Sequence, residues 1–237
     1  MSPARRIAVV GGASGIGAST ARTLAAAGDS VIILDRDGEA AAALAAAIGA
    51  RAITLDVADA DSVAHAFAAL EAPLHGLVVS SGVVDTGKLA SLDVARWNEI
   101  LAVNLTGVFL CCRAASPLLA EGGRIVTLSS LAARTGGVIT GAAYAASKAG
   151  VEALTKSMAQ ELAPRSITVN CVSPGAIDTP MTAQHPAEQK ARYDAIVPLR
   201  RHGRAEEVAA AIRFLLSKEA SYLTGAVIPV NGGVRMD

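Results

Sequence analysis

Short apolar segments alternate with longer segments of helical periodicity along nearly the whole chain. The apolar segments are continuous or β-branched, without regular polar interruptions, which is typical of strands covered on both faces. They are residues 7–10, 30–34, 52–55, 77–79, 124–128, 167–172 and 226–230. The segments between them, such as 92–119 and 149–162, carry apolar residues three and four positions apart. This alternation predicts an α/β fold with a doubly wound, mostly seven-stranded parallel sheet.

One segment, at about residues 176–203, breaks this alternation. It contains Pro180, Pro186 and Pro198, scattered charges and only a short helical stretch. It is too long for an ordinary connection, and insertions of this length are often lids or binding loops. A surface excursion without function is the alternative. No repeat, low-complexity tail or linker marks a second domain. We therefore predict a single domain, residues 1–237, with a substrate lid at about 176–203.

The overall composition excludes several classes of function. Lys plus Arg and Asp plus Glu both total 21 and form no basic stripe, so we expect no nucleic-acid partner. No uninterrupted apolar stretch approaches the roughly 20 residues of a membrane span. The N-terminus lacks the apolar core of a secretory signal, so we expect a cytoplasmic protein with no membrane partner. The three cysteines contain no C-x-x-C pair, and the four histidines show no ligand spacing, so we expect neither a metal site nor a catalytic histidine.

A glycine-rich turn, G-G-A-S-G-I-G, follows the first predicted strand and opens a helix. Gly11 allows the chain to turn sharply after the strand. Gly15 and Gly17 allow the backbone to approach a pyrophosphate, whose charge is favoured at the N-terminal end of a helix. Tight strand-to-helix turns need glycine in any case, so the turn alone is a weak signal. Its place between strand and helix nevertheless predicts a dinucleotide site in a Rossmann-type domain.

Asp35 ends the second predicted strand. Its carboxylate can accept hydrogen bonds from both hydroxyls of an adenosine ribose, and it would repel a 2′-phosphate. Arg36 follows at once and would attract such a phosphate, which leaves NADP open. A helix-capping role is a further alternative for Asp35. The preferred cofactor is NAD.

Tyr144 and Lys148 lie four residues apart in the run Y-A-A-S-K. On a helix, this spacing places both side chains on the same face. An ammonium group there favours ionisation of the phenol, whose ordinary pKa is about 10. Such a tyrosine suits proton transfer near neutral pH. The pair arises by chance on many helices, but together with the glycine turn it indicates a dehydrogenase.

From residue 7 to residue 233 the chain resembles the short-chain dehydrogenase/reductase family, with at least five motifs in the family's order. The resemblance implies that the glycine turn holds the cofactor phosphates and that Asp56 and Val57 contact the adenine. It implies that the segment 79–82 lines the cofactor, although this segment reads V-S-S-G where the family usually has N-N-A-G. Val10 also departs from the family, because many members have threonine there.

The run 173–179 matches the turn that receives the nicotinamide carboxamide in that family. The resemblance assigns this contact to the backbone of Ile177 and the hydroxyl of Thr179. The predicted cofactor-binding residues are Gly11, Ser14, Gly15, Ile16, Gly17, Asp35, Arg36, Asp56, Val57, Ser81, Gly82, Tyr144, Lys148, Pro174, Gly175, Ile177 and Thr179.

Asn104, Ser130, Tyr144 and Lys148 align with the four catalytic residues of the family. The resemblance implies that Tyr144 exchanges a proton with the substrate oxygen, and that Lys148 holds the nicotinamide ribose and keeps the phenol acidic. Ser130 would donate a hydrogen bond to the same oxygen as charge develops there. Asn104 would hold a water that links Lys148 to solvent.

Ser130 precedes Tyr144 by fourteen residues, one more than the commonest spacing in the family. Taken literally, that spacing falls on Leu131, which has no chemistry to offer. We therefore assign Ser130 and assume one extra residue in the loop 131–143. Ser129 is the alternative.

These residues predict an NAD(H)-dependent oxidoreductase that interconverts a secondary alcohol and a ketone, with Tyr144 as the general acid/base. One alternative is an NADPH-dependent 3-oxoacyl-thioester reductase, for which Arg200, Arg201 and Arg204 would face an acidic carrier partner. Another is a non-catalytic NAD(H)-binding sensor or scaffold, although members of that type usually lose the tyrosine or lysine. The resemblance implies a homotetramer.

The substrate site is expected to be an apolar cavity for a small or medium alcohol or ketone. Its candidate lining residues are Val84, Ala132, Val138, Ile139 and residues around Met181. No side chain among them identifies a molecule.

Overall fold

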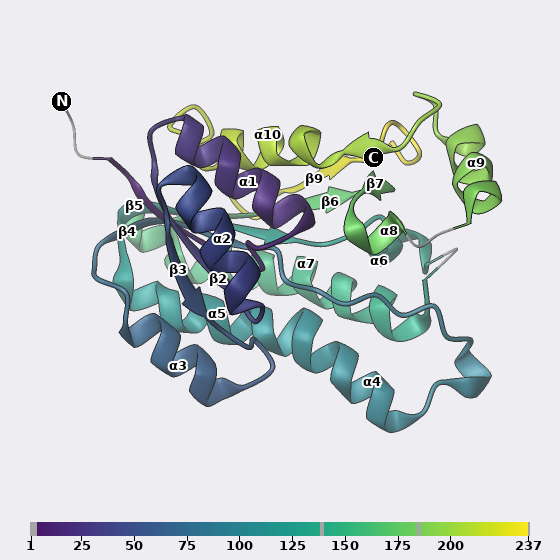
Figure 1. The fold of residues 1–237 in the computed structure, drawn as a ribbon, viewed down its shortest axis with the longest axis horizontal. Helices are drawn as coiled ribbons and strands as arrows, with labels where there is room; N and C mark the ends of the chain where they lie inside the picture. Colours follow the sequence, from purple (N-terminus) through teal and green to yellow (C-terminus); the bar gives the residue numbers. More distant parts are fainter. Residues whose placement is uncertain (1–3, 138–139, 184–185, 237) are drawn as a thin grey trace.

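A seven-stranded parallel sheet runs through the centre of the computed structural model, which describes residues 4–137, 140–183 and 186–236 (Figure 1). The strands stand in the order β3-β2-β1-β4-β5-β6-β9, and each neighbouring pair is parallel. They are β1 (Arg6–Val10), β2 (Ser30–Asp35), β3 (Arg51–Thr54), β4 (Leu74–Val79), β5 (Leu119–Leu128), β6 (Thr168–Pro174) and β9 (Val227–Val230). The predicted α/β fold is therefore confirmed, with all seven predicted strands in one sheet.

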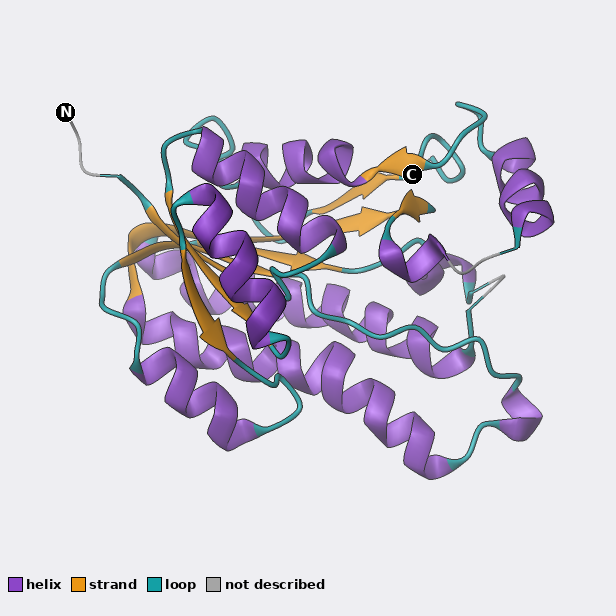
Figure 2. Ribbon diagram, in the orientation of Figure 1, coloured by secondary structure: helices purple, strands orange, loops and turns teal. Residues whose placement is uncertain are grey.

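Helices cover both faces of this sheet (Figure 2). β1 shows why the strands are apolar on both sides, since Ile7 and Val9 face one core and Ala8 and Val10 face the other. α1, α2 and α10 pack on the first core, and α3, α5 and α7 pack on the second. The helices are α1 (Gly15–Ala26), α2 (Gly38–Ile48), α3 (Ala60–Ala68), α4 (Val94–Leu101), α5 (Gly107–Ala115), α6 (Ala132–Thr135), α7 (Ala142–Leu162), α8 (Pro180–Ala183), α9 (Ala187–Ile196) and α10 (Ala205–Leu215).

The strand order reverses next to β1, and this reversal locates the site. β1 pairs with β2 on one side and with β4 on the other, so that Val10 lies beside Leu34 and beside Val79. In doubly wound sheets, ligands bind outside the carboxyl ends of the strands at such a switch point. The glycine turn follows β1 at this end of the sheet.

The predicted helix 92–119 is interrupted. α4 and α5 are joined by the π-helical turn η2 (Ala102–Thr106), which contains the buried Asn104. Single π-turns inside helices are frequent at functional sites. Three short 3₁₀ turns complete the helical elements of the described residues: η1 (Leu89–Ser91), η3 (Ser116–Leu118) and η4 (Ala163–Arg165).

By length and composition alone, the helical run Val94–Leu118 could cross a membrane. In the fold, 44% of its most apolar window is buried within the protein. Helices of a protein core pass the same test, so this finding is weak evidence for a membrane span.

The segment 176–203 forms a separate excursion. It begins at β7 (Ile177–Asp178) and ends at β8 (Gly203–Arg204), and these two strands pair in a small parallel sheet. α8 and α9 lie between them, and Figure 1 shows α9 at the outer end of the molecule. The short helical stretch predicted within this segment corresponds to α9. The excursion therefore has a hydrogen-bonded base, and its helices stand beyond the carboxyl end of the main sheet.

Candidate active site

The glycine turn packs closely against the strand ends around it. Gly11 has a φ of +70°, and a Cβ there would stand 2.5 Å from the backbone nitrogen of Ser81. A Cβ on Gly17 would stand 2.0 Å from the carbonyl oxygen of Gly11. At Gly15 the φ of +51° favours glycine, although the nearest atom to a Cβ would be Thr179 at 3.6 Å. The turn therefore requires glycine for its conformation and packing, and it leaves space between Gly15 and Thr179.

The first turn of α1 fits an anionic ligand. Ser14 is the N-cap residue, but its side chain makes no capping hydrogen bond, and the first turn contains no acidic residue. The first backbone N–H groups of a helix have no partner within the helix, and its dipole favours a negative charge beside them. Next to the turn, the buried Ser81 hydroxyl has no hydrogen-bond partner among the described residues. These features fit the pyrophosphate of a dinucleotide.

Asp35 is tied to the glycine turn. Its Oδ2 accepts a hydrogen bond from the Ala13 N–H at 2.9 Å, and its Oδ1 accepts one from the Asp37 N–H at 3.1 Å. The helix-capping alternative for Asp35 is wrong, because Asp37 is the N-cap of α2 and accepts from the Ala40 N–H at 3.0 Å. Arg36 is exposed beside them. A carboxylate oxygen has room for more than one hydrogen bond, so Asp35 can still accept from a ligand.

Asp56 and Val57 follow β3 and differ in their surroundings. Asp56 is exposed and accepts a hydrogen bond from the Ala58 N–H at 2.9 Å. Val57 is buried against Gly107, where a Cβ would stand 2.8 Å from the Val57 Cβ. Asp56 therefore offers an exposed carboxylate after β3, and Val57 belongs to the packing against α5.

Asn104 lies in the π-helical turn and clamps the chain after β4. Its Oδ1 accepts from the Val83 N–H at 2.8 Å, and its Nδ2 donates to the Val83 carbonyl at 2.9 Å and to the Ser147 Oγ at 3.2 Å. A Cβ on Gly82 would stand 3.4 Å from both the Asn104 Oδ1 and the Lys148 Nζ. The structure therefore brings Asn104, Gly82 and Lys148 together.

Tyr144 and Lys148 lie on α7, facing the end of β5. The Lys148 Nζ donates to the Leu128 carbonyl at 3.0 Å and lies 5.9 Å from the centre of the Tyr144 ring. Ser130, in the turn after β5, lines the same cavity as Tyr144, and its hydroxyl lowers the pKa of the phenol. The Ser129 hydroxyl instead contacts the Lys148 carbonyl at 3.1 Å and Glu152 at 3.0 Å. Ser130 is thus the serine whose side chain acts on the tyrosine.

Burial dominates the electrostatics of this pair. It raises the pKa of Tyr144 above the ordinary value of 10, and the hydrogen bond from Ser130 acts in the opposite direction. Burial also lowers the pKa of Lys148 to about 8. In the protein alone, removal from water has the largest effect on the phenol, and the effect of Lys148 on its pKa stays a prediction.

A cavity of about 880 Å³ opens in front of these residues. The predicted residues that line it come from the glycine turn, the segment after β4, the Ser130 turn, α7, the end of β6 and the segment that follows it. They are Ile16, Gly82, Val84, Ser130, Ala132, Tyr144, Lys148, Pro174, Gly175, Ile177, Thr179 and Met181. Other predicted residues lie outside its lining: Gly11, Ser14, Gly15, Gly17, Asp35, Arg36, Asp56, Val57, Ser81 and Asn104. Val138 and Ile139 lie outside the described residues.

Sequence analysis missed much of the outer wall of this cavity. The residues it did not identify include Thr135, Thr140, Glu188, Gln189, Arg192, Tyr193, Ile196, His202 and Val234. Those from α9 recur at helical spacing, but few of them are apolar, so no periodic pattern marked them. His202 is buried, and its Nδ1 lies 2.5 Å from the Asp194 Oδ1. This contact joins α9 to the residue that precedes β8, and it depends on the path of the chain between them, which no sequence pattern indicates.

The three arginines suggested for a carrier surface differ in their contacts. Arg201 forms two hydrogen bonds with Glu207, at 2.8 and 2.6 Å, and the Arg204 Nε lies 3.9 Å from the same carboxylate. Arg200 is exposed and donates to the Ala195 carbonyl. Their charge is therefore partly neutralised within the protein.

Comparison with known proteins agrees with this geometry. A family model described as enoyl-(acyl carrier protein) reductase matches residues 11–235. The chain is 40% identical to 3-oxoacyl-(acyl-carrier-protein) reductase of Aquifex aeolicus, with 95% of each chain covered. It is 43% identical to cis-4-hydroxycyclohexanecarboxylate dehydrogenase of Sinomonas cyclohexanicum, over 97% of this chain and 96% of that one. A Brucella melitensis structure described as a short-chain dehydrogenase/reductase (glucose/ribitol dehydrogenase) matches with a TM-score of 0.94 and 36% identity, covering 98% of this chain and 97% of that one.

Proposed function

The chain belongs to the short-chain dehydrogenase/reductase family and is an oxidoreductase of that family; we propose that it interconverts a secondary alcohol and a ketone with NAD(H). The observation that carries this proposal is the wall of the cavity. Ser130, Tyr144 and Lys148 line it together with Ile16, from the glycine turn, and Thr179, which follows β6. The proposed proton-transfer group and part of the proposed cofactor site therefore line the same cavity, which supports the proposal.

The cofactor would be held along the carboxyl edge of the sheet. The first turn of α1 would bind the pyrophosphate through its backbone N–H groups, and Asp35 would accept hydrogen bonds from the adenosine ribose. Asp56 and Val57 would lie beside the adenine, and Ile177 and Thr179 would hold the carboxamide. When bound, the nicotinamide supplies the acceptor or donor of hydride. The Asp35 carboxylate, already placed by the Ala13 N–H, supports NAD over NADP.

Proton transfer is assigned to Tyr144. In alcohol oxidation its phenolate would take the hydroxyl proton, and in ketone reduction its phenol would return it. Ser130 would donate a hydrogen bond to the substrate oxygen as charge develops there. Lys148 would hold the nicotinamide ribose and lower the pKa of the phenol. Asn104 would position a water beside Lys148, close to the Gly82 backbone.

The remaining features of the proposal concern the chain as a whole. We propose one domain over residues 1–237, with the excursion 176–203 acting as a lid over the substrate. We further propose a homotetramer in the cytoplasm that acts on small molecules. The mostly apolar wall around Leu128, Leu131 and Met181 supports an uncharged alcohol or ketone centre in the substrate.

The experiment is reduction of a ketone panel by the purified protein, with NADH and NADPH compared side by side. The panel should include 4-oxocyclohexanecarboxylate and a 3-oxoacyl thioester, because relatives act on hydroxycyclohexanecarboxylate and on 3-oxoacyl carriers. Turnover with NADH that disappears in Tyr144→Phe would support the proposal. Preference for NADPH would overturn the cofactor assignment.

A 3-oxoacyl-thioester reductase that uses NADPH is the second candidate. It is supported by the similarity to the Aquifex aeolicus reductase and by the volume of the cavity, about 880 Å³. Turnover of the thioester with NADPH alone would move it to first place. Binding of both cofactors without turnover of any substrate would favour a sensor or scaffold, although Tyr144 and Lys148 are both present.

A further inference from the structure

We propose that Glu152 and Arg134 are positioning residues that hold the turn carrying Ser130 against α7, and thereby set the position of Ser130 relative to Tyr144. The proposal rests on the function proposed above, because it concerns the same proton-transfer site. It assigns a role to the ion pair between the buried Glu152 and the partly exposed Arg134, neither of which lines the cavity.

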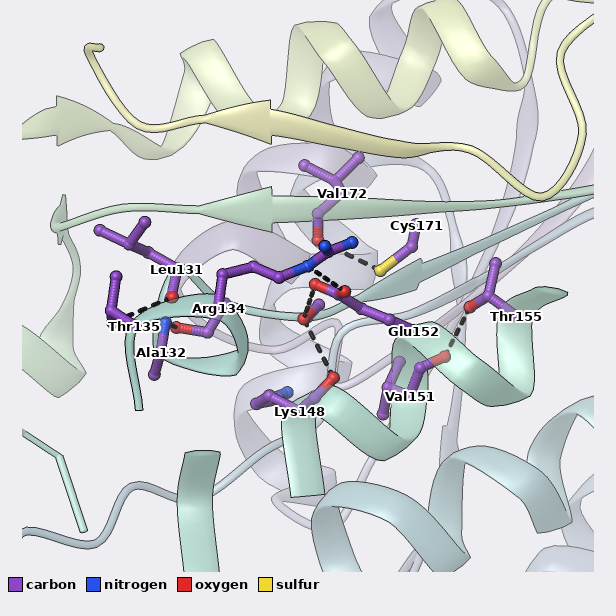
Figure 3. A network of polar contacts seen from close by, with 12 residues as sticks. Leu131, Ala132, Arg134, Thr135, Lys148, Val151, Glu152, Thr155, Cys171 and Val172 are labelled. Atoms are coloured by element: carbon purple, nitrogen blue, oxygen red, sulfur yellow. Dashed lines mark hydrogen bonds and ion pairs between the residues drawn. The ribbon is translucent and has the colours of Figure 1, made fainter. Parts of the chain in front are cut away.

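The side chains of Ser129, Arg134 and Glu152 form what we call the brace. Glu152 lies on α7, one turn after Lys148, and Figure 3 shows it meeting Arg134, which extends from α6. The Glu152 Oε2 lies 2.5 Å from the Arg134 Nε, and its Oε1 lies 3.0 Å from the Ser129 Oγ. The Ser129 hydroxyl also lies 3.1 Å from the Lys148 carbonyl oxygen. One carboxylate therefore joins the helix of Tyr144 and Lys148 to the turn after β5.

The brace holds that turn on both sides of Ser130. Ser129 precedes Ser130 directly, and Arg134 follows it by four residues. On the opposite side the backbone is fixed to β6: the Ser129 N–H donates to the Val172 carbonyl at 2.9 Å, and the Leu131 N–H donates to the Pro174 carbonyl at 2.9 Å. Ser130 therefore sits between two anchored neighbours, and its hydroxyl has a defined place opposite the phenol.

Burial makes a purely stabilising role a poor explanation. Ser129 and Glu152 are 4% and 5% exposed, and the Arg134 side chain is 33% exposed. Replacing a buried ion pair by apolar groups is often neutral or stabilising, since the pair must be removed from water. An apolar pair would fill the same space, but it would not fix the position of the turn through directional contacts. The two contacts of the Glu152 carboxylate, with Arg134 and with Ser129, fix that position.

A contact farther along the same helix provides an internal comparison. Thr155, on α7, lies 2.8 Å from the Thr127 Oγ1 of β5 and donates to the Val151 carbonyl at 2.8 Å. These hydroxyls also join α7 to β5, but they carry no charge, and Figure 3 shows Thr155 farther from Lys148 along the helix than Glu152. A neutral contact thus joins α7 to β5 away from the site, and the ion pair joins α7 to α6 closer to Tyr144.

Loss of the brace should therefore act on Tyr144 through Ser130. The hydrogen bond from Ser130 lowers the pKa of the phenol against the effect of burial. If the turn shifts, this hydrogen bond weakens and the phenolate becomes harder to form. The rate of alcohol oxidation falls as a result, while the glycine turn and the cofactor contacts remain in place.

The test compares Glu152→Gln and Arg134→Met with Glu121→Gln as the matched control. Glu121 pairs with Arg165 at 3.0 Å, and the Arg165 side chain, at 34% exposed, matches Arg134. We expect both brace variants to lower kcat about tenfold with an unchanged KM for the cofactor. Their pH profile for oxidation should shift upward by about half a pH unit to one unit. The control should change neither quantity.

The same comparison in a Ser130→Ala background separates positioning from a general effect. There, Glu152→Gln should cause no further loss of kcat. An equal further loss, or folded brace variants with unchanged kcat and pH profile, would overturn the proposal.

Amide hydrogen exchange of residues 129–136 supplies a readout that needs no turnover. It should be faster in Glu152→Gln than in the Glu121→Gln control. Unchanged exchange overturns the brace itself. Absence of Tyr144-dependent turnover in the parent would overturn the proposed function instead, and the exchange result would still decide whether the brace exists.

Discussion

The inner wall of the cavity and the helix α9 face the same space but are held in different ways. The wall is built from β5, β6 and α7, and Lys148 within it is 4% exposed with its Nζ on the Leu128 carbonyl. In α9 no residue is buried, and Ile196 is 60% exposed. The groups proposed to move a proton are thus held at fixed distances within the core. The residues of α9, on the substrate side, are held in place by a few contacts at the edge of the fold.

This difference suggests how the two regions share the work. Proton transfer depends steeply on geometry, so its groups need a rigid support. Substrate binding requires only adequate complementarity, and an exposed helix can provide it. Changes to the wall should therefore reduce kcat, whereas changes to α9 should alter KM.

The largest expected effect is that of Tyr144→Phe. Removing the hydroxyl should lower kcat about a thousandfold, because no other group is placed to exchange the proton. The phenol is mostly buried, and phenylalanine keeps its volume, so the melting temperature should change little. Turnover at fixed substrate and the thermal unfolding curve would check both points. Retention of kcat would show that the wall is not the proton-transfer region.

Lys148→Met tests how much the burial of the Lys148 ammonium group reduces the free energy of unfolding. Burial lowers the pKa of Lys148 to about 8, against an unfolded value of about 10.4. Between these values only the unfolded chain holds the proton, so the free energy of unfolding of the parent rises with pH. Relative to Lys148→Met, it should rise by about 1 to 2 kcal/mol between pH 7 and pH 9.5. Urea unfolding of both proteins at the two pH values measures this, and a constant difference would contradict it.

Asp194→Ala tests the attachment of α9. The variant loses the contact between Asp194 and His202, so the KM for substrate should rise about three- to tenfold while kcat stays within about twofold. Asp178→Ala is the matched control, because its contact with Lys190 on the same helix is long, at 3.9 Å, and a smaller rise in KM is expected. A fall in kcat with unchanged KM would place α9 in the chemical step and remove the contrast between the regions.

The smallest effect is expected from Ile196→Ala. Its side chain is exposed, so the free energy of unfolding should change by less than about 0.5 kcal/mol. Val151→Ala, in the fully buried face of α7, should cost about 2 kcal/mol by comparison. Chemical denaturation of the two variants measures both changes in the free energy of unfolding and therefore their ratio. Equal costs would mean that α9 is packed as firmly as the wall.

Sequence patterns predicted the strands well but misplaced some of their beginnings. β4 begins at Leu74 and β5 at Leu119, earlier than the predicted residues 77 and 124. His75 and the run Glu121–Gly123 interrupt the apolar pattern, yet the backbone of Leu74 still lies opposite Leu119 in the sheet. Backbone pairing does not require an apolar side chain, so hydrophobicity alone could not locate these ends.

The residues of the candidate site also divide into those that a local sequence signal identified and those that it did not. Gly11, Gly15 and Gly17 were identifiable because a sharp turn between strand and helix leaves a local signature, and the two glycines with positive φ carry it. The meeting of Arg134 with Glu152 was not identifiable, since it joins residues eighteen positions apart through a turn of unknown geometry. The residues that α9 contributes to the cavity wall could not be identified from the sequence either, because they are mixed in polarity and form no apolar pattern.

The order of strands and helices, the dinucleotide turn and the shared face of Tyr144 and Lys148 follow from the sequence by itself. Each depends on periodicity or on a spacing within one helix, and such local geometry is the same in any fold. Only the tertiary structure decided that Ser130 and not Ser129 acts on the phenol, and that burial raises the pKa of Tyr144 although Lys148 lies nearby. The environment of a buried group is the sum of contributions from segments far apart in the chain, so no local pattern contains it.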